Sequence, residues 1–198
     1  MDPRPAATVI VARSFDDGIE VLALTRAAAS RFAPGFTVFP GGAIEPGDEG
    51  LAARLFGAPD EAARACALRE LYEEAGVLLT AEGPQIREPG EPIDTIRFDP
   101  PAPDMLVEVS RWIAPEQLEK RFDARFFATG APAGLRPHPD GTEIEDARWA
   151  RPEDLLAAAE RGDATLMWPT YVTLRELQGC RSVADVLALR VDQVDRIR

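Results

Sequence analysis

Two apolar runs near the start of the chain, at residues 7–12 and 19–24, have the composition of buried β-strands. Asp16, Asp17 and Gly18 stand between them and form a sequence typical of a tight turn, so we expect an antiparallel hairpin. A shorter apolar run at 36–39 leads directly into Pro40-Gly41-Gly42 and predicts a strand that ends at a turn.

The pattern then changes to the period of an α-helix. Asp60 is suited to be its N-cap and Gly76 to be the left-handed residue that ends it, so we expect a helix over about 61–75. Its apolar positions share one face and are Leu68, Leu71 and Ala75. This face can anchor the helix to a core.

The second half of the chain alternates between both patterns. Residues 82–104 are rich in proline, glycine and charge and predict an irregular surface segment. Strand character returns at 105–113, 121–129 and 142–149, Pro152 opens a helix through Glu160, and 168–190 is mostly helical. Strands interspersed with helices predict a layered α/β or α+β fold. We expect one domain over 1–198 with a C-terminal helical tail at about 168–198.

Composition narrows the class of protein. The chain has 198 residues, of which 45% are hydrophobic, enough for one sizeable core. A net charge of −12 argues against a nucleic-acid partner, which needs a basic surface. No apolar run is long enough to span a membrane, residues 1–5 lack the features of a secretion signal, and the two cysteines do not suggest a disulfide framework. We therefore expect a cytoplasmic protein without membrane or nucleic-acid partners.

Three carboxylates in the predicted helix are the strongest chemical signal. Glu70, Glu73 and Glu74 stand at spacings of i, i+3 and i+4, so they share one side of the helix. Like charges placed in this way repel one another unless cations neutralise them. Mg²⁺ and Mn²⁺ prefer such oxygen ligands, often together with substrate phosphates. A solvated acidic face is the alternative.

The run from Arg69 to Val77 resembles the Nudix box, whose core is Arg-Glu-hydrophobic-any-Glu-Glu-any-Gly-hydrophobic. The resemblance implies a Nudix α/β/α sandwich with a mixed central sheet and a Mg²⁺ or Mn²⁺ cofactor. Glu70, Glu73 and Glu74 occupy the metal-ligand positions of the box, and Arg69 would orient Glu73. The implied activity is hydrolysis of a phosphoanhydride in a small nucleotide substrate.

One interval of the box departs from the family pattern. The glycine turn and an outer acid match at Gly42 and Asp48, but Arg69 then follows too late in the chain. Glu61 stands at the expected distance before Arg69. We interpret residues 49–60 as an insertion that loops out between the glycine turn and the helix. Whether Asp48 or Glu61 takes the role of the outer acid stays open.

A second signature precedes the box. Arg26, Arg31, Gly35 and the Phe39-Pro40-Gly41-Gly42 turn resemble in spacing the motif of Nudix coenzyme A diphosphatases, in particular the peroxisomal-type branch with an inserted box. The resemblance makes Arg26, Arg31, Gly41 and Gly42 candidate substrate-binding residues, since guanidinium groups pair bidentately with phosphates. Simple salt bridges to the acidic surface are the alternative for the arginines.

This branch implies cleavage of coenzyme A or acyl-coenzyme A to 3′,5′-ADP and a 4′-phosphopantetheine. Activity on ADP-ribose or NADH is the main alternative, and a module that senses a nucleotide without cleaving it is a second. Within the family the general base is sometimes a glutamate of the box and sometimes a glutamate from a later loop. Glu143 is our later-loop candidate for this catalytic role and Glu145 the second, with a polar strand edge as the alternative for both. Many Nudix enzymes are dimers, so the resemblance is compatible with a homodimer, although no predicted strand or helix has a pattern that indicates an interface.

Other reactive residues carry less weight. His138 lies in a turn-like segment, Cys66 falls within the box helix, and we expect a surface position for the first and a packed position for the second. Four residues could line a pocket for an acyl or pantetheine chain, but packing is the simpler account for them: Met167, Trp168, Pro169 and Tyr171.

Overall fold

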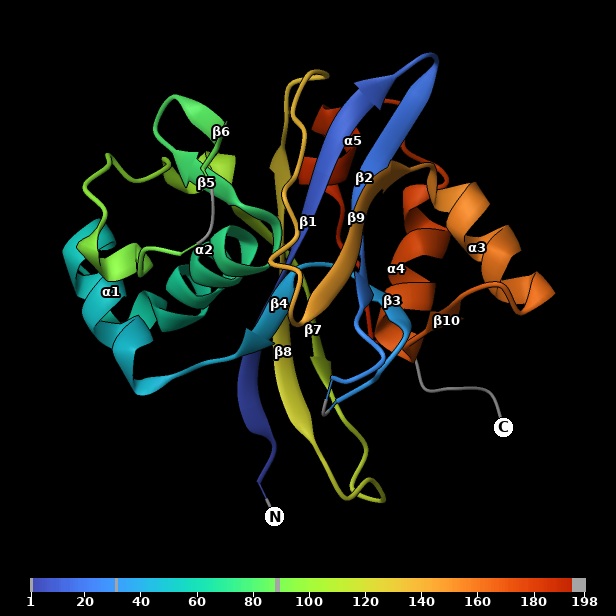
Figure 1. The fold of residues 1–198 in the computed structure, drawn as a ribbon, viewed down its shortest axis with the longest axis horizontal. Coiled ribbons are helices and arrows are strands. Elements are labelled where there is room, and N and C mark those ends of the chain that lie inside the picture. Colours follow the sequence, from blue (N-terminus) through green and yellow to red (C-terminus); the bar gives the residue numbers. More distant parts are fainter. Residues whose placement is uncertain (1, 31, 88–89, 194–198) are drawn as a thin grey trace.

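The computed structural model describes residues 2–30, 32–87 and 90–193. A large mixed sheet stands in the middle, with α1 and α2 against one face and α3 and α4 against the other (Figure 1). The strands are β1 (Arg4–Phe15), β2 (Gly18–Arg26), β3 (Phe36–Val38), β4 (Gly41–Ala43), β5 (Val77–Thr80), β6 (Gly83–Ile86), β7 (Val107–Ile113), β8 (Phe122–Gly130), β9 (Ile144–Ala150) and β10 (Thr165–Leu166). The α-helices are α1 (Pro46–Phe56), α2 (Ala62–Ala75), α3 (Pro152–Arg161), α4 (Trp168–Leu177) and α5 (Val183–Ala188).

The main sheet has the strand order β10-β3-β2-β1-β8-β7, with β4 paired to β1 and β9 paired to β2. The β1 and β2 strands form the antiparallel hairpin that the turn at Asp16 predicts. β1 runs parallel to β8, and β9 lies antiparallel to β2, with Arg26 opposite Ile144. This last pairing brings two distant segments together at one end of β2.

Both faces of the sheet are covered, which explains the nearly continuous apolar runs of β1 and β2. Val9 and Val11 point into a core formed with α1 and α2. Ile10 and Ala12 point into a second core with α3, α4 and α5. Alternating residues of one strand therefore enter opposite layers. The predicted α/β/α sandwich with a mixed sheet is confirmed.

The segment between the glycine turn and the box helix differs from the prediction. Residues 46–56 form helix α1 and do not loop out; Leu51, Ala52 and Leu55 are buried against α2 and the sheet. These three residues have the i, i+1, i+4 spacing of a helix face. Asp60 is not the N-cap of α2, because residues 59–61 form a 3₁₀ turn and Glu61 holds the cap position.

The remaining elements follow the sequence with smaller differences. Residues 82–104 are mostly irregular, but β6 within them pairs with β5 in a short separate hairpin, which the prediction missed. Helices α4 and α5 lie in the predicted helical tail, of which residues 194–198 lie outside the described part. Within the described residues, no helix combines the length and hydrophobicity needed to cross a membrane.

Candidate active site

Helix α2 presents the three glutamates at different depths. Glu74 is 5% exposed and Glu70 is half-buried, whereas the side chain of Glu73 is 45% exposed. The helix ends at Gly76 in the left-handed conformation, with φ of 64°, as the sequence predicts. Glu74 is thus buried and Glu73 exposed because α2 packs one side against the sheet and turns the other toward solvent.

Glu74 is held beneath the glycine turn. Its Oε2 accepts a hydrogen bond from the backbone N–H of Gly41 at 2.9 Å, and its Oε1 lies 3.4 Å from Nη1 of Arg26. Burial, together with the charge of Glu70, raises the pKa of Glu74 to about 8, although the Gly41 N–H and Arg26 act against this rise. A carboxyl group with such a pKa gains strongly from an added cation.

Glu70 lies against Gly42. A Cβ atom at position 42 would stand 2.2 Å from Oε1 of Glu70, so any residue other than glycine would displace that carboxylate. Gly42 does not have a positive φ, and its requirement is therefore one of space alone. Gly41 is restricted as well, since a Cβ there would lie 2.6 Å from the carbonyl oxygen of Ala7. Burial raises the pKa of Glu70, even though Arg69 beside it has the opposite effect.

Arg69 joins α1 to the carboxylates of α2. Its Nε donates to Oδ1 of Asp48 at 2.8 Å, and its Nη1 lies 2.7 Å from Glu70 and 2.9 Å from Glu73. Asp48 is 1% exposed and also accepts from the backbone N–H of Glu45. Asp48 therefore holds Arg69, the arginine of the box sequence, in position.

Glu61 has a different partner. Its carboxylate lies 3.0 Å from Nε of Arg64, one turn along the chain, and its side chain is 36% exposed. These contacts favour Asp48 over Glu61 as the outer acid, because Asp48 contacts Arg69 whereas Glu61 pairs with Arg64. The helix α1 is what brings Asp48 to this place.

Arg26 connects the α2 carboxylates to the segment before β9. Its Nη2 lies 3.4 Å from Oε2 of Glu143, while its Nη1 is directed at Glu74 and its Nε donates to the carbonyl of Phe32. The side chain of Glu143 is 68% exposed. The geometry thus brings Arg26 and Glu143 together with Glu74. Glu145 is exposed on β9, and Arg31 lies outside the described residues.

The residues given less weight have structural surroundings. Cys66 is buried, and burial raises the pKa of its thiol. His138 is exposed, and its backbone N–H donates to the carbonyl of Ala75 at 2.8 Å. Trp168 and Tyr171 stack at 5.6 Å between ring centroids and pack against the second core. These placements fit packing and surface positions.

The carboxylates have the chemistry of a site for a hard cation, but they are not assembled as one here. Across residues 2–30, 32–87 and 90–193, no three acidic, histidine or cysteine side chains converge to hold a metal ion. Arg69 contacts Glu70 and Glu73, and Arg26 contacts Glu74. The raised pKa values of Glu70 and Glu74 nevertheless indicate an environment that favours an added positive charge.

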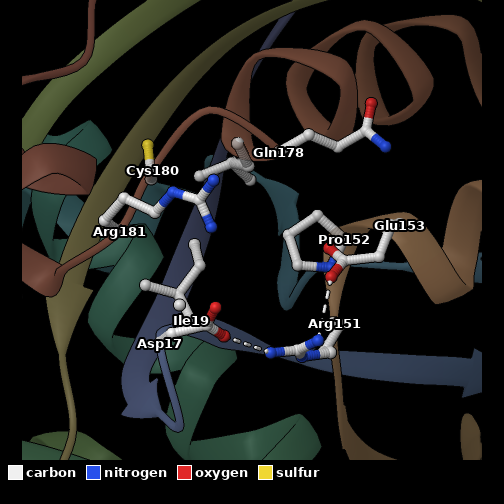
Figure 2. Close-up of a pocket in the computed structure, with 10 residues that line it drawn as sticks. Asp17, Ile19, Arg151, Pro152, Glu153, Gln178, Cys180 and Arg181 are labelled. Carbon is white, nitrogen blue, oxygen red and sulfur yellow. Dashed lines mark hydrogen bonds and ion pairs between the residues drawn. The ribbon is translucent and has the colours of Figure 1, made fainter.

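A small cavity of about 100 Å³ lies elsewhere, between the β1–β2 turn, the start of α3 and the end of α4. Arg151 and Arg181 both line it, and Figure 2 shows that Arg151 is directed at Asp17 and Glu153. Its distances to these two carboxylates are 3.2 and 3.4 Å. These two carboxylates balance the positive charges of Arg151 and Arg181, so this cavity does not have the character of an anion-binding site.

One residue near the site was missed by the sequence analysis. The carboxylate of Asp140 accepts hydrogen bonds from the backbone of residues 142–144, immediately around Glu143. The Asp140-Gly141 pair marks a turn in the sequence. It does not reveal that this turn would stand beside α2, because that depends on the pairing of β9 with β2.

Comparison with known proteins is consistent with this geometry. The NUDIX domain model matches residues 2–168. The chain belongs to the Nudix family. Nudix hydrolases generally use divalent metals such as Mg²⁺ or Mn²⁺, and membership of the family supports pyrophosphohydrolase activity for this chain.

Three individual relatives are similar to this chain at 26–30% sequence identity. A Nudix hydrolase structure from Alicyclobacillus acidocaldarius is 30% identical, with a TM-score of 0.82, covering 96% of this chain and 98% of that one. The protein named nudix hydrolase 7 in Caenorhabditis elegans is 27% identical over 88% of this chain and 60% of its own length. The acyl-coenzyme A diphosphatase of Homo sapiens is 26% identical over 86% of this chain and 63% of its own. This Nudix chain therefore spans less than two thirds of those two relatives.

Proposed function

We propose that this Nudix chain hydrolyses the phosphoanhydride of coenzyme A or acyl-coenzyme A, releasing 3′,5′-ADP and 4′-phosphopantetheine or its acylated form. The observation that carries the proposal is the set of carboxylates under the Gly41-Gly42 turn, with Arg26 bridging Glu74 and Glu143. A small nucleotide substrate, a cytoplasmic location and a homodimer remain predictions of the sequence.

Glu70, Glu73 and Glu74 would hold Mg²⁺ or Mn²⁺. When bound, the metal would supply Lewis-acid stabilisation of the charge that develops on the phosphate oxygens. Glu73 is the most exposed of the three, and its ion-pair partner within the described residues is Arg69, so its side chain can turn toward a cation with little rearrangement. Asp48 and Arg69 would keep Glu70 in place during this change.

Glu143 is our candidate for the general base that takes a proton from the attacking water. Its carboxylate is exposed to solvent yet lies within ion-pair distance of Arg26, whose other nitrogen faces Glu74. A base needs to reach both water and the reacting phosphate. Glu145, two residues further along the chain on β9, is the second candidate, and within the described part of the structure it has no hydrogen-bond or ion-pair partner on α2.

Support for coenzyme A comes from two sources. The spacing of Arg26, Arg31, Gly41 and Gly42 resembles the coenzyme A diphosphatase motif, and one relative is named an acyl-coenzyme A diphosphatase. The contacts of Arg26 with two carboxylates indicate that it would have to change partners to bind a phosphate. Hydrolysis of ADP-ribose or NADH is the alternative substrate class.

The substrate proposal is tested by comparing kcat/KM for coenzyme A, acetyl-coenzyme A, dephospho-coenzyme A, ADP-ribose and NADH, with Mg²⁺ and separately with Mn²⁺. We expect coenzyme A or its acyl form to exceed the dephospho form by about tenfold or more, the gain from one charge-assisted contact to the 3′-phosphate. Higher efficiency on ADP-ribose or NADH would replace coenzyme A by the alternative class. Absence of turnover with all five would favour a non-catalytic nucleotide sensor.

A further inference from the structure

The segment that carries Glu143 is fixed to the end of α2. The backbone N–H of His138 donates to the carbonyl of Ala75 at 2.8 Å, next to Glu74 in sequence. A Cβ atom at Gly76 would lie 3.2 Å from the Cβ of His138, so the two segments are in close contact. The segment therefore begins its path to β9 directly beside the proposed metal ligands.

Asp140 then closes the turn. Its carboxylate accepts hydrogen bonds from the backbone N–H groups of Thr142 at 3.2 Å, Glu143 at 3.1 Å and Ile144 at 2.8 Å, and from the hydroxyl of Thr142. Gly141 adopts a φ of 72° and donates to the carbonyl of Ile144 at 3.1 Å. One carboxylate thus fixes three consecutive backbone donors.

Glu143 depends on this backbone for its position. Its carbonyl accepts from the N–H of Ala27 at 2.8 Å and from the hydroxyl of Ser30 at 3.1 Å, which places the turn over the end of β2. Its own side chain is mostly exposed, and among the described residues its carboxylate has one ion-pair contact, at 3.4 Å with Arg26. A long exposed side chain with one weak contact is positioned mainly by its main chain.

We propose that Asp140 is a positioning residue for the reaction, which holds the turn of residues 140–144 so that the Glu143 carboxylate stands beside Arg26 and Glu74. This inference rests on the proposed function and on Glu143 as the base. It extends both, because Asp140 would set the position of an exposed base through the backbone. In the described part of the structure Asp140 contacts neither the proposed metal ligands nor the carboxylate of Glu143.

The titration behaviour of Asp140 agrees with this role. Burial alone would raise its pKa, but the hydrogen bonds from Thr142 and from the backbone N–H groups of residues 142–144 lower it below its usual range. The carboxylate is therefore charged throughout the neutral range, as three backbone donors require. Asparagine, which keeps one accepting oxygen, can retain part of the turn, whereas alanine cannot.

The test is a double-mutant cycle on kcat with Asp140→Ala, Glu143→Gln and the double variant. Glu143→Gln should lower kcat about a hundredfold or more, the usual contribution of a general base. Asp140→Ala should lower kcat about tenfold or more, since small misplacements of reacting groups have large effects on rate. The double variant should be no slower than Glu143→Gln alone, within about threefold, because Asp140 acts through Glu143.

Two variants accompany the cycle. Asp140→Asn should recover most of the kcat lost in Asp140→Ala. Asp146→Ala is the matched control, because that carboxylate lies nearby and, among the described residues, its ion-pair partner is the exposed Arg148. Losses that multiply in the double variant, or a Glu143→Gln variant with wild-type kcat, would overturn the proposal.

Hydrogen exchange gives a measurement that needs no turnover. In Asp140→Ala, the amides of residues 142–144 should exchange about tenfold faster or more, as expected when a net hydrogen bond of order 1.5 kcal/mol is lost. The Asp146→Ala control should leave them unchanged. Unchanged exchange in Asp140→Ala would overturn the positioning role even if the chain is an active hydrolase. Absence of turnover in the wild-type protein would refute the proposed function separately.

Discussion

Substitution of Gly42 by alanine is expected to disable the site while leaving the fold in place. The added Cβ would lie 2.2 Å from Oε1 of Glu70 and 2.6 Å from its Cδ. Because the Gly42 φ is not positive, alanine can adopt the same backbone conformation, and the conflict is confined to the Glu70 side chain. To reach an ordinary contact of 3.4 Å, the carboxylate must move by about 1.2 Å.

The size of the effect follows from that displacement. A shift of about 1 Å in a catalytic group can lower the rate about a hundredfold. Glu70 cannot move freely, because Arg69 holds its oxygen at 2.7 Å. The strain of inserting a methyl group should lower the free energy of unfolding by only about 1–3 kcal/mol. We therefore expect a kcat loss near a hundredfold with a cooperative thermal transition.

Two glycine variants serve as controls for this prediction. Gly50→Ala, within α1, has no atom within 4 Å of the new Cβ and should keep wild-type kcat, with a gain of up to about 1 kcal/mol in stability. Gly41→Ala would place its Cβ 2.6 Å from a backbone oxygen of β1, so it should destabilise the fold itself. The assay combines kcat, thermal unfolding and Mn²⁺ binding. A Gly42→Ala variant within threefold of wild-type kcat would refute the steric argument.

Three further predictions concern the same site and the stability of the sheet. Glu74→Gln should lower kcat at least about a hundredfold, by analogy with the loss of one electrostatic contact, while its circular dichroism stays unchanged; near-normal turnover would remove Glu74 from the site. Asp48→Asn should lower the free energy of unfolding by about 1.5–3 kcal/mol in urea titrations, because a buried charged hydrogen bond is lost. Glu61→Gln should change that free energy by less than about 1 kcal/mol, since the Glu61 side chain is partly exposed and water screens its pair with Arg64; an equal effect of the two substitutions would contradict the assignment of the outer acid. The hydrogen bond from Arg111 lowers the pKa of Asp123, so this pair stabilises the fold above the unfolded-state pKa of about 3.9 and loses that contribution as the pH falls through the folded-state pKa. Because Arg111 is mostly exposed, the free energies of unfolding of wild type and Asp123→Asn should differ by less than about 1 kcal/mol. This difference should shrink from pH 6 to pH 3, and a constant difference would contradict the assigned pKa shift.

The local pattern predicted the box helix well. Its limits came within one residue of the structure, because the apolar spacing and the left-handed glycine at 76 are both short-range signals. The α/β/α arrangement followed from the resemblance to the Nudix box. Helix α1 was misjudged since the departure from the family spacing suggested a loop, although Leu51, Ala52 and Leu55 had the pattern of a helix face.

The contacts of the site were less predictable. Asp48 meets Arg69 only because α1 packs on α2, and Arg26 meets Glu143 only because β9 pairs with β2 in one register. Both contacts join residues far apart in sequence, and periodicity carries no information on them. The role of Asp140 likewise required the position of its turn, which the Asp-Gly pair alone does not give.

The central claim is that the α2 carboxylates support hydrolysis of the coenzyme A phosphoanhydride by water. It is tested most directly by incubating coenzyme A and Mg²⁺ with wild type or Glu74→Gln in ¹⁸O-labelled water and analysing the products by mass spectrometry. The account predicts 3′,5′-ADP and 4′-phosphopantetheine, with ¹⁸O either in the 5′-phosphate of the first or in the phosphate of the second, and at least about a hundredfold less product with the variant. Cleavage at any other bond, or equal product from wild type and Glu74→Gln, would contradict it.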